Sequence, residues 1–232
     1  GMFAFVYRDA DTGNIFLARD KHGEKPLYYS VRNGRLFFAS EIKALLRHPE
    51  FLNVNIDMQS IDQYLTFDYI PGSKTLYDGI KKVLPGELVT FNNKGIIKND
   101  FYYRPVANMD DITVNNSLDN NNLIGLLQRK LETSVRDRLI ADVPVGIFLS
   151  GGLDSSLIAA IAGKISPGIE AFTVKFDGSS YDESEEAKQV ARKYALKHHI
   201  FHYNDADLVK GWNSVVKKMD EPFADASIIP TY

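Results

Sequence analysis

Short aromatic and branched runs separated by turn residues dominate the first part of the chain. Such runs favour extended backbone, and the turn residues between them favour reversals. The runs that predict strands are residues 3–7, 15–18, 36–39, 87–91 and 95–98. The stretch DADTGN, the tight-turn signal NGR and the residues between the last two runs predict the connections. Residues 40–46, with Ser40 as N-cap, and residues 56–65 predict short helices, so this part is mostly sheet.

The amino-acid composition changes at residues 104–122, RPVANMDDITVNNSLDNNN, where asparagine and aspartate dominate and apolar residues show no regular spacing. This composition predicts a linker. A helical period follows, in which an apolar residue recurs every fourth position with charged residues largely on the other face. Its apolar positions are Leu123, Leu127, Leu131, Val135 and Leu139. A second domain is therefore predicted to begin at residue 123.

That domain alternates between strand and helix patterns. The predicted order is strand 145–149, helix 153–163, strand 170–176, helix 182–195 with Asp182 and Glu185 as a capping box, strand 198–203, and a helix from Asp205 onward. Alternation of this length predicts right-handed crossovers on a parallel sheet covered on both faces. Such sheets bind ligands at the carboxyl ends of their strands.

The stretch FLSGGLDSS lies at that place, between the first of these strands and its helix. Amides at a helix start point outward, and glycine lets a phosphate oxygen approach the backbone. Ser150, Ser155 and Ser156 add hydroxyl donors, whereas Asp154 would repel phosphate unless Mg²⁺ lay between them. The spacing fits neither the lysine-bearing P-loop nor the dinucleotide fingerprint. The alternative from spacing alone is a Gly-Gly turn with Asp154 and Ser155 as helix caps.

Composition narrows the classes of partner. The chain has 232 residues, 44% apolar, with a net charge of -3 and no cysteine. It is expected to be globular, without a basic field for nucleic acid, and without disulfides, thiolate metal sites or a catalytic thiol in these residues. No window is apolar enough for a membrane helix and no secretory signal leads the chain, so a cytoplasmic location is the expectation.

FLSGGLDSS resembles the pyrophosphate-binding loop of the ATP pyrophosphatase family, whose members split ATP to AMP and pyrophosphate while adenylating a carboxylate or a related oxygen. Nearly the whole chain, from GMFAFVYRD through FLARDKHGEKPLYY and YDESEEAKQVA to DEPFADASIIPTY, resembles the glutamine-hydrolysing asparagine synthetases. The resemblance implies an α/β plus α+β chain with three parts. These are the end of a partial Ntn-type glutaminase sandwich (1–103), a linker (104–122), and the start of a parallel-sheet adenine-nucleotide hydrolase-like synthetase domain (123–232).

The resemblance also implies a reaction and its site residues. A full-length protein would use ATP and Mg²⁺ to make asparagine from aspartate and glutamine-derived ammonia through β-aspartyl-AMP. Leu149 and Val174 would contact the adenosine, Asp154 the metal, and the loop the phosphates. The loop residues are Ser150, Gly151, Gly152, Leu153, Asp154, Ser155 and Ser156. Another carboxylate acceptor, a non-catalytic nucleotide-binding module and a homodimer stay open.

The family's nucleophilic cysteine and its second nucleotide segment, an SGEGSDE-like stretch, have no counterpart in these residues. We therefore expect a piece of a longer protein, with no catalytic residue of its own. An isolated piece of this kind is expected to self-associate through uncovered strand edges and apolar faces.

Three other groups have competing interpretations. Arg19, Asp20 and Lys25 are interpreted as a buried ion pair or loop clamp rather than as part of the tunnel through which, as the resemblance implies, ammonia reaches the synthetase domain. The histidines at 198, 199 and 202 alternate in direction along a strand, which favours core and rim positions over a metal cluster. Glu221 and Asp225 fit either an acceptor or nucleotide contact, or a polar loop after a helix.

Overall fold

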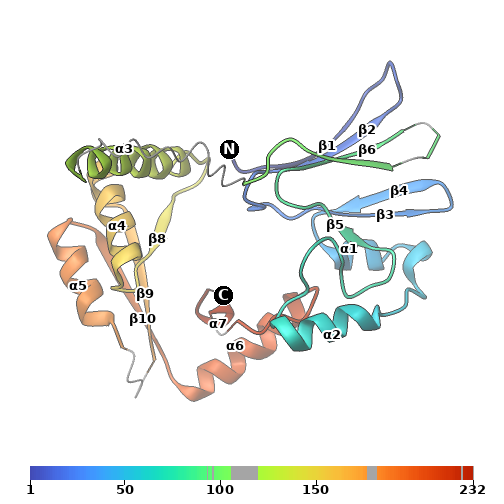
Figure 1. Ribbon diagram of the computed structural model, residues 1–232. Helices are drawn as coiled ribbons and strands as arrows, with labels where there is room; N and C mark the ends of the chain where they lie inside the picture. The colour runs from blue at the N-terminus through green and yellow to red at the C-terminus, as the bar shows by residue number, and fades with distance from the viewer. Residues whose placement is uncertain (93, 96, 106–119, 177–181, 226, 232) are drawn as a thin grey trace. The chain divides into compact units, whose positions relative to one another are not determined.

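The computed structural model describes residues 1–232 except 93, 96, 106–119, 177–181, 226 and 232. The chain divides into two compact units (Figure 1). Unit 1 comprises Gly1–Ala107 and Lys217–Ser227, and unit 2 comprises Asn108–Val216 and Ile228–Tyr232. Most of the predicted linker lies outside the described residues. Its last residues begin a helix, because α3 spans Asn120–Arg138.

Two antiparallel sheets form most of unit 1. One has the order β1-β2-β6-β7 and the other β4-β3-β5. Their bounds are β1 Ala4–Arg8, β2 Ile15–Arg19, β3 Tyr28–Arg32, β4 Arg35–Ala39, β5 Lys81–Lys82, β6 Glu87–Phe91 and β7 Ile97–Phe101. The three predicted hairpin connections are confirmed, and Asn33 and Gly34 both have positive φ, as a tight I′ turn requires. β3 and β5 are not among the strands that the sequence pattern predicts.

Strand β3 lies at the centre of its sheet and contributes a buried side chain to the core. Tyr29 packs with Leu17 of β2 and Val89 of β6 in one buried cluster, so side chains of both sheets share a core. A second cluster joins α1 (Ile42–Leu46), the 3-10 turn η1 (Pro49–Phe51) and Ile80. The remaining helix of the first hundred residues is α2, Met58–Phe67, with Asp57 as its N-cap.

The predicted N-cap of α1 is wrong. Glu41, not Ser40, is at the cap position, and its side chain makes no capping hydrogen bond. The Asp220 carboxylate instead accepts hydrogen bonds from the backbone N–H groups of Ile42 at 2.5 Å and Lys43 at 3.3 Å. A residue far along the chain therefore supplies the cap, which local sequence could not reveal.

Unit 2 contains the predicted parallel sheet, in the order β10-β9-β8. Its strands are β8 Gly146–Phe148, β9 Glu170–Phe176 and β10 Lys197–Tyr203. The helices are α3, α4 Leu153–Ile165, α5 Ser184–Lys193, α6 Asp205–Lys218, which ends in unit 1, and α7 Ile228–Thr231. The register pairs Ile147 and His198 with Ala171 from either side, and thereby fixes which side chains share a face.

The expectation that both faces are covered is wrong for the described residues. β8, β9 and β10 follow one another in a single direction across the sheet, so right-handed crossovers place α4 and α5 on the same face (Figure 1). That face buries Leu149, Ala171 and Ala187. The other face exposes aromatic side chains, with Phe148 at 66% and Phe201 at 49%.

The helical period of α3 is confirmed only in its second half. Leu131, Val135 and Leu139 pack against α4, whereas Leu123 and Leu127 are exposed. No helix within the described residues is both long and apolar enough to cross a bilayer.

Candidate functional site

The loop Ser150–Ser156 connects the end of β8 to α4, as the strand-helix alternation predicts. Its entry is fixed by Leu149, which is 1% exposed and whose N–H donates to the Phe172 carbonyl at 2.9 Å. Gly152 is the N-cap residue of α4 and has no side chain to cap the helix. The first-turn amides of a thirteen-residue helix therefore face outward without a capping partner in this segment.

Both the backbone conformation and the neighbouring atoms require a glycine at position 151. Its φ is +93°, a conformation that side chains disfavour. A Cβ placed there would lie 2.7 Å from the Glu183 carbonyl oxygen and 3.0 Å from the Glu186 Cβ. The loop is thus packed directly against the start of α5, which holds its backbone close to that helix.

Serine hydroxyls organise the inside of the loop. Ser150 Oγ and Ser155 Oγ are 2.8 Å apart, and the Ser150 N–H donates to Ser155 Oγ at 3.3 Å. The Gly152 N–H donates to Ser150 Oγ at 3.3 Å, and Ser156 Oγ donates to the Gly151 carbonyl. The loop therefore contains several hydroxyl and N–H donors close together. Donors of this kind can form hydrogen bonds with the oxygens of an anion.

Asp154 is exposed in the first turn of α4, where the helix dipole favours a negative group. The alternative that Asp154 and Ser155 serve only as caps is not supported, because Gly152 holds the cap position. No group of three or more metal-ligating side chains occurs among the residues that the structure describes. A cation at Asp154 would take its remaining oxygens from a ligand and from water.

A charged pair that the sequence analysis did not predict adjoins the loop region. Lys175 of β9 forms an ion pair with Asp182 at 2.6 Å, and Asp182 also accepts the Ser184 N–H. The hydrogen bond from Lys175 is the main reason that the pKa of Asp182 falls to about 2. The predicted capping box is wrong, because Glu183 is the N-cap residue of α5 and Glu185 pairs with Lys188.

The two residues assigned to adenosine by resemblance lie on opposite faces of the sheet. The Leu149 side chain is buried under α4 and α5 with Ala171, so it is core. Val174 follows Thr173 in β9 and is half-buried on the opposite, aromatic face.

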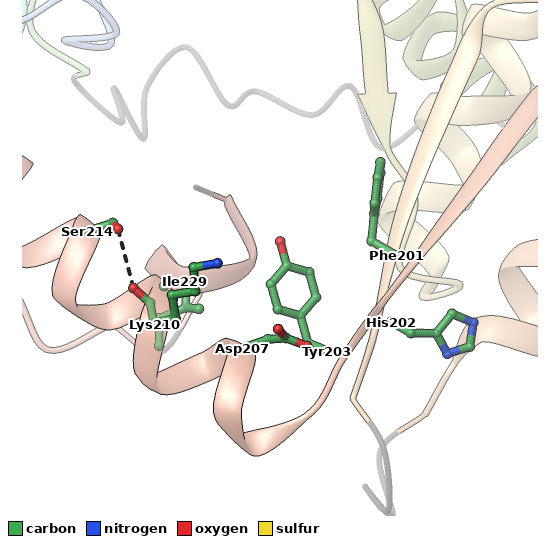
Figure 2. Close-up of a pocket in the computed structure, with 8 residues that line it drawn as sticks. Phe201, His202, Tyr203, Asp207, Lys210, Ser214 and Ile229 are labelled. Carbon is green, nitrogen blue, oxygen red and sulfur yellow. Dashed lines mark hydrogen bonds between the residues drawn. The ribbon is translucent and has the colours of Figure 1, made fainter.

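A cavity of about 460 Å³ lies at the carboxyl end of β10, within unit 2 (Figure 2). Tyr203, Asp207, Lys210 and Ile229 line it, and the Ser214 hydroxyl donates to the Lys210 carbonyl at its edge. Carboxyl ends of parallel strands share one edge of a sheet, so this cavity and the serine loop belong to the same edge. None of these four lining residues was predicted from the sequence as a site residue.

The loop-clamp interpretation of residues 19–25 is confirmed. Asp20 is 1% exposed and accepts the N–H groups of His22, Glu24 and Lys25, each at 3.0 Å. Burial alone would raise its pKa, but these backbone hydrogen bonds outweigh burial and lower it to about 2. Arg19 donates to the carbonyls of Gly23, Lys25 and Val83.

Two histidines of β10 contact side chains of β9, which fits the predicted core and rim positions. His198 contacts Thr173, and the His199 ring stacks on Phe172 with centroids 5.2 Å apart. The pKa of His198 is lowered by burial, with smaller contributions from His199 and Lys188.

Glu221 takes part in unit 1. Its carboxylate accepts the Leu76 N–H at 2.7 Å and pairs with Lys82 at 2.9 Å, where both side chains are mostly buried. Asp225 accepts the Ser227 N–H. The polar-loop interpretation therefore fits Asp225, and Glu221 is an anchor within unit 1.

Comparison with known proteins matches both parts of the chain. A family model described as "Asparagine synthase" matches residues 126–232, and one described as "Glutamine amidotransferase domain" matches residues 1–103. The chain is 32% identical over its whole length to glutamine-hydrolyzing asparagine synthetase 1 of Bacillus subtilis, and 31% identical to putative glutamine-hydrolyzing asparagine synthetase 2 of Methanocaldococcus jannaschii. It is 30% identical over 97% of its length to Amidase chyE of Penicillium rubens.

The chain spans only part of each of these relatives, 35% of the first, 44% of the second and 35% of the third. The two family models nevertheless match successive segments of the chain in an order that fits the two types of domain expected from its motifs. Over its whole length the chain is similar to glutamine-hydrolysing asparagine synthetases.

Proposed function

We propose that the loop Ser150–Ser156 binds the phosphates of ATP. The observation that carries this proposal is the uncapped start of α4 behind a loop whose Gly151 has positive φ and packs against α5. Exposed amides and the helix dipole favour anionic oxygens, and the serine hydroxyls add donors. The same residues match the loop signature of the family.

Asp154 is proposed as the residue that meets Mg²⁺. Mg²⁺ usually keeps one or two carboxylates and fills its remaining positions with phosphate oxygens and water. A single exposed carboxylate on the first turn of α4 fits that donor set. When bound, the ion would neutralise charge on the pyrophosphate portion of ATP.

Leu149 and Val174 are proposed to flank the adenosine in different ways. The Leu149 side chain is committed to the core, so its contribution would come from the backbone at the end of β8. Val174 is half-buried on the other face and can offer its side chain.

For the longer protein, we propose ATP-dependent synthesis of asparagine from aspartate and glutamine. A carboxylate is a poor electrophile at neutral pH, and transfer of AMP to the β-carboxylate supplies a good leaving group as pyrophosphate departs. Ammonia released from glutamine then attacks the acyl carbon and displaces AMP. The proposed division is a glutaminase part at 1–103, a linker at 104–122 and the start of the synthetase part at 123–232, and the family matches support it. Cytoplasmic location, a homodimer and the lack of a nucleic-acid partner stay predictions.

The first experiment measures ATP binding to the 232-residue chain by calorimetry, in the presence and in the absence of Mg²⁺. Asp154→Asn is expected to weaken binding only when Mg²⁺ is present, because the carboxylate acts through the ion. Gly152→Val is expected to abolish binding by filling the approach to the loop. Asp137→Asn is the matched control, since Asp137 is an exposed carboxylate on α3 of the same unit.

Absence of ATP binding at millimolar concentration would overturn the proposal. Equal effects of Asp154→Asn and Asp137→Asn would overturn the metal assignment alone. In the longer protein, pyrophosphate release with aspartate as acceptor tests the reaction, and release with a different carboxylate would redirect the substrate assignment.

A further inference from the structure

A buried chain of hydrogen bonds ends at the peptide that leads into the loop. Thr173 is 3% exposed in β9, and its hydroxyl donates to the Leu149 carbonyl oxygen at 2.5 Å. The same hydroxyl oxygen lies 2.7 Å from His198 Nε2. The register places Thr173 and His198 on one face of adjacent strands, so both belong to the sheet.

The direction of this chain follows from the number of available protons. A threonine hydroxyl carries one hydrogen, and a carbonyl oxygen can only accept. The hydrogen is therefore used toward Leu149, and the contact with His198 requires a hydrogen on Nε2. The order is His198 Nε2–H to Thr173 Oγ1, and Thr173 O–H to the Leu149 carbonyl.

This chain fixes a peptide plane at the loop entrance. The peptide between Leu149 and Ser150 is trans, so its carbonyl and its N–H point in opposite directions. The Leu149 N–H is held by the Phe172 carbonyl, and the Leu149 carbonyl by Thr173. With both groups fixed, the Ser150 N–H is directed toward Ser155 Oγ within the loop.

We propose that Thr173 and His198 are positioning residues for nucleotide binding, an inference that rests on the proposed function. Neither residue lies in the loop; they act by holding the Leu149–Ser150 peptide, whose N–H orients Ser155 Oγ within the loop that is proposed to bind the phosphates. A hydroxyl between the apolar neighbours Phe172 and Val174 is the sequence signal that could have drawn attention to Thr173.

The test compares variants that remove the chain of hydrogen bonds with variants that keep its donors. Thr173→Val and His198→Leu remove it, whereas Thr173→Ser retains the hydroxyl and His198→Gln retains an N–H donor. His199→Gln is the matched control, because His199 is adjacent but lies on the opposite face against Phe172. The probe is Mg·ATP, titrated by calorimetry.

We expect Thr173→Val and His198→Leu to raise the Kd by about tenfold, the loss of one buried hydrogen bond. Thr173→Ser, His198→Gln and the control should stay within about threefold. NMR gives a readout that thermal stability alone would not move: the Leu149 carbonyl carbon and Ser150 amide nitrogen should shift in the two removing variants and not in the control.

Each outcome separates the two ideas. If the wild-type chain does not bind ATP, the proposed function fails, while the two backbone shifts still test whether the chain of hydrogen bonds orients the peptide. Unchanged Kd and unchanged shifts in Thr173→Val would overturn the inference. If the removing variants do not fold, nitrogen shifts of wild-type His198 decide, since a neutral ring protonated on Nδ1 contradicts the donor that the chain requires.

Discussion

Substitution of Gly151 by alanine carries two energetic costs, one from the positive φ of the backbone and one from the close contact of the added Cβ. A control variant separates them. Gly151 has φ of +93°, and an added Cβ would meet the Glu183 carbonyl oxygen at 2.7 Å. Gly168 has φ of +78°, but nothing lies within 4 Å of a Cβ added there. Both glycines belong to unit 2, so Gly168→Ala is a matched control that carries the backbone cost without the contact.

The expected magnitudes follow from these contacts. Left-handed backbone costs a side-chain-bearing residue about 1–2 kcal/mol relative to glycine, and both variants carry that cost. Forcing an extra carbon into a packed site adds about 1–3 kcal/mol. The contacting atom at Gly151 is backbone and cannot rotate away, so Gly151→Ala should lose about 2 kcal/mol more than Gly168→Ala.

Chemical denaturation followed by tryptophan fluorescence measures the difference, because Trp212 is the single tryptophan of the sequence and lies in unit 2. Calorimetry with Mg·ATP on the folded variants should show weaker binding for Gly151→Ala and unchanged binding for Gly168→Ala. If the two variants lose the same free energy within about 0.5 kcal/mol, the close packing of the loop on α5 is refuted.

Three further predictions concern charged groups. Asp20→Asn should destabilise unit 1 by at most about 2 kcal/mol at neutral pH. Because the folded-state pKa of Asp20 is lowered to about 2, the extra stability of the wild type is present above pH 3.8 and is lost as the pH falls through 2. Hydrogen exchange of peptides from residues 1–103, measured at several pH values, follows this loss. Asp220→Asn combined with Glu221→Gln should speed hydrogen exchange at the Ile42 and Leu76 amides, whereas Asp225→Asn, in the same segment, should not; equal exchange in both variants would refute the anchoring role. Lys175→Met should raise the pKa of Asp182 toward its ordinary value in a carboxyl NMR titration, and an unmoved titration would show that Lys175 is not the main cause.

The parallel sheet and its loop were predictable because their signals are local. Each strand and helix of unit 2 has its own hydrophobic period, and a strand followed by glycines and a helix already predicts where outward-facing amides will be. The Asn33-Gly34 turn was predictable for the same reason, since the residue types match a required φ. The strand at 28–32 was missed even though that turn implies a partner on each side.

Other features depend on residues that meet only in the fold. The cap of α1 comes from Asp220, and the Leu76 amide is bound by Glu221, although both acidic residues lie far along the chain. The family match places them with the synthase segment, whereas their contacts place them in unit 1. No pattern along the sequence encodes a hydrogen bond between such distant positions.

The sequence by itself determined the alternating elements of unit 2, the serine-glycine loop at the end of its first strand, and the family that the chain resembles. Those features depend on short-range periodicity and backbone preference. Only the tertiary structure decided that both crossover helices cover one face, that Gly151 packs against α5, and that His198 and Thr173 hold the Leu149 carbonyl. These depend on strand order and register, which bring distant residues within hydrogen-bonding distance.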